Sequence, residues 1–164
     1  MHVFISDAHI RTDQSERAQL LIKFLHDLTK ECTDLYVLGD LFEFWFEYNI
    51  SFPKDYFRIL ATLYNIIQEG KRVHYVLGNH EVMIGNFLHG FGFIVHKSET
   101  VVDIDGQKVF LAHGNRVDRR LCTWMWEKLL TSKINHALYS LLHPDVGVFL
   151  AQGIAHLSRK QRRS

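Results

Sequence analysis

Short apolar runs with the length of β-strands alternate with longer helical patterns through the first half of the chain. The strand-like runs cover residues 2–5, 35–38 and 73–77, and the helical patterns cover 15–31 and 53–68. This alternation predicts parallel strands joined by helical crossovers, so the predicted fold class is α/β, a layered β-sheet core with flanking helices. Asp13 and Glu16, three residues apart, resemble a capping box that would begin the first helix.

The pattern changes after residue 98. Two strand-like runs, 99–104 and 107–112, flank Asp105 and Gly106, a dipeptide typical of a two-residue β-hairpin turn. Three stretches with apolar residues at helical spacing then fill residues 116–164. We therefore divide the chain into a core of residues 1–115 and a carboxy-terminal helical segment of residues 116–164.

Polar residues of one kind follow the strand-like runs. They are Asp7, His9, Asp40, Asn79, His80 and His113. Because ligands of open α/β sheets bind beyond the carboxyl ends of the strands, we expect these residues to converge. Imidazoles mixed with oxygen donors suit Mn²⁺, Fe or Zn²⁺. Taken singly, each residue could equally be a turn former or a helix cap.

Two details of that site can be anticipated. Asp7 and His9 would face the same side if the backbone there stays extended, since alternate residues of a strand share a face. Asp40 has two carboxylate oxygens and could bridge two cations. Two such ions would clamp a phosphoryl group and activate a water.

Composition and charge limit the setting. Of 164 residues, 47% are hydrophobic and only two are cysteine, which fits a core-forming chain in a reducing cytosol. No apolar run has the roughly 18 residues of a membrane span. Residues 1–115 carry a net charge of −5 and residues 116–164 a net charge of +6. The acidic part could hold cations and the basic part could meet an anionic surface, although both could be ordinary solvated faces.

Four of these segments resemble sequence blocks of the calcineurin-like metallophosphoesterases, in the same order. They are Asp7-Ala8-His9, Gly39-Asp40, Gly78-Asn79-His80-Glu81 and His113-Gly114. The run from Gly39 to Trp45 is similar to that of a narrower branch, the UDP-2,3-diacylglucosamine diphosphatases. That branch also has a helical insertion after its His-Gly block, in the place of residues 116–164.

The resemblance implies a set of metal ligands and a reaction. Asp7, His9 and Asp40 would hold one divalent ion, and Asp40, Asn79 and His113 a second. The ions would be Mn²⁺, with Fe, Zn²⁺ or Mg²⁺ as alternatives. The enzymes of the branch hydrolyse the pyrophosphate of UDP-2,3-diacylglucosamine to UMP and lipid X in lipid A biosynthesis. They are cytoplasmic and act as peripheral proteins at the inner membrane.

The chain departs from the branch at two points. His80 and Glu81 stand where the branch has arginine after the asparagine, as in generic members of the family. The fifth block of the family, Gly-His-x-His, does not occur before Ser164, so we expect this chain to be an amino-terminal portion of a longer enzyme.

The segment Gly78-Asn79-His80-Glu81 implies two catalytic roles. His80 would contact the phosphate or protonate the leaving oxygen, with Glu81 orienting its ring. Alternatively, His80 is only a hydrogen-bond donor to the phosphate. The segment 41–46, in which four aromatic residues surround Glu43, is expected to border the site. A buried plug beneath the site is favoured over direct contact with the substrate.

Residues 116–164 are expected to cap the site and receive the acyl chains of the substrate. Arg116, Arg119 and Arg120 would face the diphosphate, and Trp124, Met125 and Phe149 would line an apolar groove. The basic residues of 159–163 could add roughly 1 kcal/mol each against anionic lipid headgroups. The alternative is that these apolar stripes only pack against one another and against the sheet.

Two other functions are compatible with the sequence. The first is a different phosphodiesterase or nucleotide phosphatase on the same scaffold, which the His80-Glu81 pair favours. The second is a non-catalytic scaffold that binds a metal or a phosphate. We expect no nucleic-acid partner, because the basic residues lack a recognisable binding motif.

Overall fold

The computed structural model describes residues 1–28, 32–47, 53–78, 80–83 and 86–114. Its centre is a four-stranded parallel sheet in the order β1-β2-β4-β6. The strands are β1 (His2–Ile5), β2 (Asp34–Leu38), β4 (Arg72–Val76) and β6 (Ile94–His96). The predicted parallel pairing is confirmed for the first three strands, whereas β6 was not foreseen. All four strands run the same way, so their carboxyl ends form one edge of the sheet.

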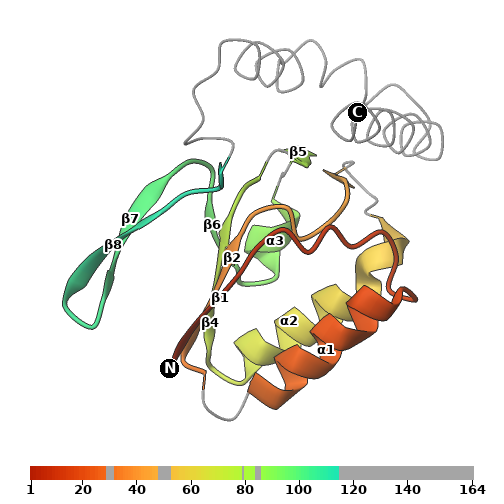
Figure 1. Cartoon of the computed structure of the whole chain (residues 1–164), viewed down its shortest axis with the longest axis horizontal. Coiled ribbons are helices and arrows are strands. Elements are labelled where there is room, and N and C mark those ends of the chain that lie inside the picture. The colour runs from red at the N-terminus through yellow and green to blue at the C-terminus, as the bar shows by residue number, and fades with distance from the viewer. Residues whose placement is uncertain (29–31, 48–52, 79, 84–85, 115–164) are drawn as a thin grey trace, which may run out of the picture.

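Two helices cover one face of the sheet (Figure 1). They are α1 (Glu16–Leu28) and α2 (Phe57–Gln68), and a 3-10 turn, η1 (Lys54–Tyr56), precedes α2. Leu25 of α1 and Leu63 of α2 are fully buried with Val37 and Val73 of the sheet in one apolar core. Burial of such side chains contributes about 1.5–3 kcal/mol each, which fixes the sheet that carries the site.

The start of α1 differs from the predicted capping box. The Ser15 hydroxyl accepts a hydrogen bond from the Ala18 N–H (3.2 Å), so Ser15 caps α1. The Asp13 carboxylate instead accepts the N–H groups of Arg58 and Ile59, in the first turn of α2. Asp13 therefore ties the segment before α1 to the second helix, a long-range contact that the local sequence pattern does not reveal.

A β-hairpin covers part of the other face of the sheet. It consists of β7 (Thr100–Ile104) and β8 (Gln107–Leu111), paired antiparallel as predicted. Asp105 and Gly106 have φ of +52° and +81°, the left-handed pair that a two-residue turn of this kind requires. Leu111 packs with Tyr36 and Val76 in a second apolar cluster, so the hairpin places the residues after β8 over the carboxyl edge.

Three short elements complete the described residues. They are β3 (Trp45–Phe46), β5 (Glu81–Met83) and α3 (Phe87–Gly90). β3 pairs with β5 in parallel, which draws together the segments that follow β2 and β4. Among the described residues no helix is long and apolar enough to cross a membrane.

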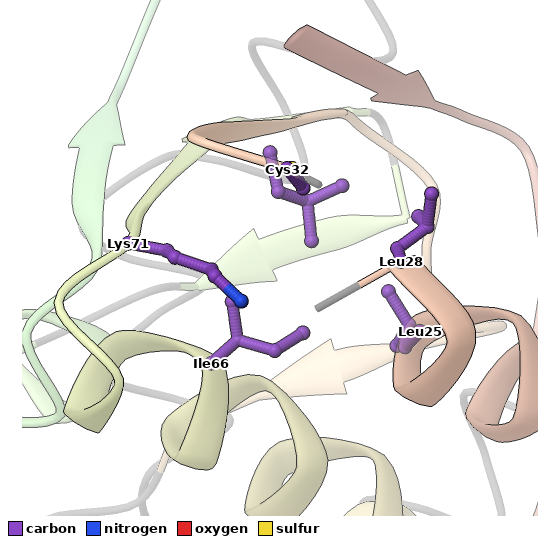
Figure 2. Close-up of a pocket in the computed structure, with 6 residues that line it drawn as sticks. Leu25, Leu28, Cys32, Ile66 and Lys71 are labelled. Carbon is purple, nitrogen blue, oxygen red and sulfur yellow. The ribbon is translucent and has the colours of Figure 1, made fainter. Parts of the chain in front are cut away.

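A small apolar pocket lies at the opposite, amino end of the sheet (Figure 2). Its lining includes Leu25 and Leu28 of α1, Ile66 of α2, Cys32 and Lys71. Its volume of about 10 Å³ leaves space for about one water. This pocket is too small and too apolar for the chemistry expected of the polar residues at the other edge.

Candidate metal centre

The segments that follow β1 and β2 are joined at the carboxyl edge of the sheet. The backbone N–H groups of Asp7 and His9 donate to the carbonyl oxygens of Gly39 (3.1 Å) and Asp40 (2.9 Å). Asp7, His9 and Asp40 have φ of +53°, +45° and +52°. This left-handed conformation costs a non-glycine residue roughly 1 kcal/mol and is concentrated at functional sites.

The condition for Asp7 and His9 to face the same side, an extended backbone, is therefore not met. β1 ends at Ile5, and the chain turns twice before Ile10. Asp7 and His9 are brought to the site by these turns and not by the alternation of a strand. The turns also explain how the two side chains enter different groups of donors.

Two groups of potential metal ligands share one carboxylate. His9, Asp40 and His80 form the first group, and Asp7, Asp40 and His113 form the second, each with ligand atoms within 4.8 Å of one another. One carboxylate oxygen of Asp40, Oδ2, lies 3.8 Å from His9 Nε2, 3.9 Å from His80 Nε2 and 3.3 Å from His113 Nε2. Over the described ranges these are the only groups of three such donors.

The grouping differs in detail from the expected one. Asp7 lies with His113 and not with His9. His80 lies in a donor group, although we expected it to contact the phosphate or protonate the leaving oxygen. The sequence shows which residues follow the strands, but it cannot show how two successive turns separate neighbours such as Asp7 and His9. Asn79, an expected ligand, falls outside the described residues.

Backbone carbonyl groups orient two of the histidine rings. His80 Nδ1 lies 2.6 Å from the Glu43 carbonyl oxygen, and His113 Nδ1 lies 2.7 Å from the Leu38 carbonyl oxygen. A carbonyl oxygen only accepts, so Nδ1 carries the proton in both rings. Nε2 of each ring is therefore directed to the shared Asp40 carboxylate, in the arrangement of metal-binding histidines that donate their other N–H to a carbonyl.

The shared carboxylate and His113 form a buried ion pair. Burial by itself would raise the pKa of Asp40, but the hydrogen bonds from the His113 ring and the His80 backbone N–H lower it. Burial by itself would lower the pKa of His113, but the hydrogen bonds with Asp40 and Leu38 raise it to about 9. At neutral pH a proton on His113 therefore occupies the place that a cation would take.

Glu81 does not have the contacts expected of it. Its carboxylate accepts hydrogen bonds from three backbone N–H groups and from the Tyr75 hydroxyl, and the orientation of the His80 ring comes from Glu43. Burial, followed by the nearby Asp40 carboxylate, raises the pKa of Glu81. Tyr75 could not be identified from the sequence, because it lies inside β4 and resembles an apolar core residue.

The aromatic segment after Asp40 lies beneath the site. Phe42 and Trp45 are fully buried and stack on each other with ring centroids 5.1 Å apart. The backbone N–H of Trp45 donates to the His80 carbonyl oxygen (3.0 Å), so the segment borders the candidate metal ligands as expected. For Phe42 and Trp45 the buried plug is confirmed.

A second histidine cluster lies on the sheet face that the hairpin partly covers. His74 Nδ1 is 3.1 Å from His96 Nε2, and burial lowers the pKa of both rings. The fully buried Asp34 carboxylate pairs with Arg72 and lies 3.1 Å from His2 Nδ1. Because an arginine already occupies the carboxylate, this cluster is a structural ion-pair network.

Several expected site residues fall outside the described part of the chain. They are Arg116, Arg119, Arg120, Trp124, Met125 and Phe149, together with the whole segment 116–164. The described residues thus contain five of the expected metal or catalytic side chains close together, and Glu81 below them.

Two glycines at left-handed positions offer a matched test of this packing. Gly39 has φ of +84°, and a Cβ there would lie 2.7 Å from His113 Nδ1. Gly70 has φ of +83°, and a Cβ there would meet nothing within 4 Å. We expect Gly70→Ala to lower the free energy of unfolding by about 1–2 kcal/mol through backbone strain alone. Gly39→Ala should cost about 1–3 kcal/mol more through overpacking.

Urea unfolding of both variants measures this difference. Equal losses for the two alanines would show that the turn at Gly39 is not held against His113.

Comparison with known proteins assigns the class. Residues 3–152 match the family of calcineurin-like phosphoesterases, and the chain belongs to that family.

Relatives named UDP-2,3-diacylglucosamine hydrolase are similar over most of this chain. The one from Porphyromonas gingivalis is 32% identical over 96% of the chain, and the one from Aeromonas salmonicida is 32% identical over 74%. The one from Pectobacterium carotovorum is 33% identical over 74%. The chain spans 63%, 46% and 49% of the lengths of these three relatives.

Proposed function

We propose that this chain is a metal-dependent hydrolase that cleaves the pyrophosphate of UDP-2,3-diacylglucosamine to UMP and lipid X. The observation that carries the proposal is the Asp40 carboxylate, which belongs to both groups of donors. The names of the relatives support the choice of substrate.

The donor set fits divalent cations. One group offers two imidazoles and a carboxylate, and the other offers two carboxylates and an imidazole. Such mixed nitrogen and oxygen donors suit Mn²⁺, Fe or Zn²⁺, and we propose Mn²⁺. Cations held there would supply the positive charge that activates water and offsets the charge of a phosphoryl group. Asn79 is proposed as a further ligand.

The residues of the chain have separate tasks in this scheme. Asp40 belongs to both donor groups and would therefore hold the two cations close together. The Glu43 carbonyl fixes the His80 ring with Nε2 toward Asp40. There Nε2 either completes the first donor group or, when it carries a proton instead, protonates the leaving oxygen or donates a hydrogen bond to a phosphate. Phe42 and Trp45 close the site from below and exclude water from that side.

Residues 116–164 are proposed to form the helical cap over this edge. β8 ends at Leu111 and His113 is one of the donors, so the cap would begin next to the site. Arg116, Arg119 and Arg120 would face the diphosphate, and Trp124, Met125 and Phe149 would contact the acyl chains.

Association with an anionic membrane surface is proposed for the basic residues of 159–163. Reversing their charge should weaken co-sedimentation with anionic vesicles, and unchanged binding would contradict this part.

The test compares two substrates with and without Mn²⁺. UMP release from UDP-2,3-diacylglucosamine and nitrophenol release from bis(p-nitrophenyl) phosphate are measured on the same preparation. We expect Mn²⁺-dependent UMP release that Asp40→Asn abolishes and that Asp27→Asn, an exposed aspartate of α1, leaves unchanged. Turnover of only the nitrophenyl ester would favour the alternative, a different phosphodiesterase with the generic His80-Glu81 pair. Metal binding without turnover of either substrate would favour the non-catalytic scaffold.

A further inference from the structure

Glu81 has a buried carboxylate whose hydrogen-bonding capacity is filled by the two segments that flank it. Its Oε2 accepts the N–H groups of Asp40 (2.9 Å) and Gly78 (2.8 Å), and its Oε1 accepts the N–H of Leu41 (3.0 Å) and the Tyr75 hydroxyl (3.0 Å). The residue is 3% exposed. With four donors on two oxygens it cannot also serve as a base or touch a substrate.

The connection between the two segments is reciprocal. Glu81 binds the backbone of Asp40, and Asp40 Oδ1 accepts the backbone N–H of His80 at 3.0 Å. Each segment thus contributes one carboxylate to the backbone of the other. The backbone and the side chain of Asp40 are both fixed from residues that follow β4.

This fixation acts on a strained residue. Asp40 has φ of +52°, a conformation that is less stable by roughly 1 kcal/mol and needs support from its surroundings. The two N–H groups that Glu81 accepts belong to Asp40 and to the next residue, Leu41. A relaxed Asp40 backbone would turn these N–H groups away from Glu81 and its carboxylate away from the three imidazoles.

The Asp40 side chain has little free space on the side of Gly78. A Cβ on Gly78 would lie 2.2 Å from Asp40 Oδ1, so the carboxylate rests directly on the backbone of the opposite segment. In addition, no lysine or arginine of the described residues forms an ion pair with Glu81. A buried carboxylate satisfied only by N–H and hydroxyl donors is costly unless all of those donors stay in place.

We propose that Glu81 is a positioning residue of the metal centre: its carboxylate holds Asp40 in the left-handed conformation that places one side chain in both donor groups. The inference rests on the proposed function in that it takes these groups to bind cations. It replaces the expected role of Glu81 beside His80, and it adds Tyr75 as a supporting donor.

Three variants of the full 164-residue chain test this role. Glu81→Gln keeps the shape but loses the charge and half of the acceptor capacity. Tyr75→Phe removes a single donor. Leu63→Ala, in the buried face of α2, lowers stability away from the site and serves as the control. Two quantities are measured at a temperature where each variant is folded: the Kd for Mn²⁺, from the paramagnetic resonance of the free ion, and the hydrogen-exchange rates of the Asp40 and Leu41 amides.

We expect Glu81→Gln to raise the Kd for Mn²⁺ by about 10–100-fold, the usual effect of losing a partner that orients a ligand. The two amides should exchange at least about tenfold faster relative to the rest of the sheet. Tyr75→Phe should change both quantities in the same direction by less. Leu63→Ala should leave the Kd within about twofold and accelerate exchange throughout.

Two results would overturn the inference. One is a Glu81→Gln protein with an unchanged Kd and unchanged exchange at Asp40 and Leu41. The other, decisive if Glu81→Gln does not fold, is a Tyr75→Phe protein that matches the wild type in both quantities. If the wild type itself bound no Mn²⁺, the proposed function would fail, whereas amide exchange would still decide whether Glu81 holds Asp40.

Discussion

Asp40→Asn should remove Mn²⁺-dependent hydrolysis almost completely while the protein stays folded. Asparagine tolerates the left-handed backbone of residue 40 and still offers an oxygen to the His80 N–H, so the local structure is kept. What is lost is the negative charge common to both donor groups. We expect hydrolysis to fall by at least about 10²–10³-fold, the effect of removing one strong electrostatic contact at a reacting centre.

A control variant shows whether the loss of any carboxylate, or only of the one at residue 40, affects hydrolysis. Asp27→Asn removes one exposed carboxylate from α1 and should leave hydrolysis and unfolding unchanged. Asp40→Ala adds the loss of the hydrogen bond from His80, so it should abolish hydrolysis and also lower stability. Turnover within tenfold of the wild type in Asp40→Asn would exclude a shared carboxylate as the centre of the site.

The affinity for Mn²⁺ should rise steeply with pH between 7 and 9. The pKa of His113 is raised to about 9, so at pH 7 its ring is protonated and paired with Asp40. A cation must displace that proton, and the apparent affinity should increase about tenfold per pH unit until the pKa is passed. The total gain over this interval is roughly 50–100-fold, measured by anaerobic titration because Mn²⁺ oxidises in alkaline air.

The stability of the metal-free protein should change in the opposite direction. A histidine with a raised pKa stabilises the fold fully below its ordinary pKa near 6.5, and this stabilisation is lost as the pH rises through 9. Unfolding in the presence of a chelator should therefore show decreasing stability from pH 6.5 to 9. His113→Asn should flatten both dependences. A pH-independent affinity for Mn²⁺ in the wild type would show that the Asp40–His113 pair does not compete with the cation.

The residues of the candidate site could be identified from the sequence because each one follows an apolar run. Asp40 and His113 stand at the ends of recognisable strands, and the parallel order of β1, β2 and β4 brings such ends together whatever the details of the loops. The Asp105-Gly106 turn could likewise be predicted, since few dipeptides adopt two left-handed conformations in succession.

The internal arrangement of the site could not be predicted, because it depends on backbone torsions and on long-range contacts. The pairing of Asp7 with His113 follows from left-handed turns at Asp7 and His9, residues for which an extended backbone was equally plausible. Two of the four hydrogen bonds of Glu81, those from Asp40 and Leu41, join residues about 40 positions apart. Asp13 was assigned to the nearer helix for the same reason, although its carboxylate caps the one that begins more than 40 residues later.

The four segments that meet at Asp40 also determine how the site is coupled to folding. The donors extend from Asp7 to His113, and the ring of His113 is hydrogen-bonded to Leu38, 75 residues away. Neither donor group found among the described residues fits within a short peptide, so cation binding would be linked to the folded state of the whole sheet. A bound ion acts as a non-covalent cross-link, and its stabilising effect grows with the logarithm of its concentration above the Kd. The metal supply of the cell would therefore influence the lifetime of the folded protein as well as its chemistry.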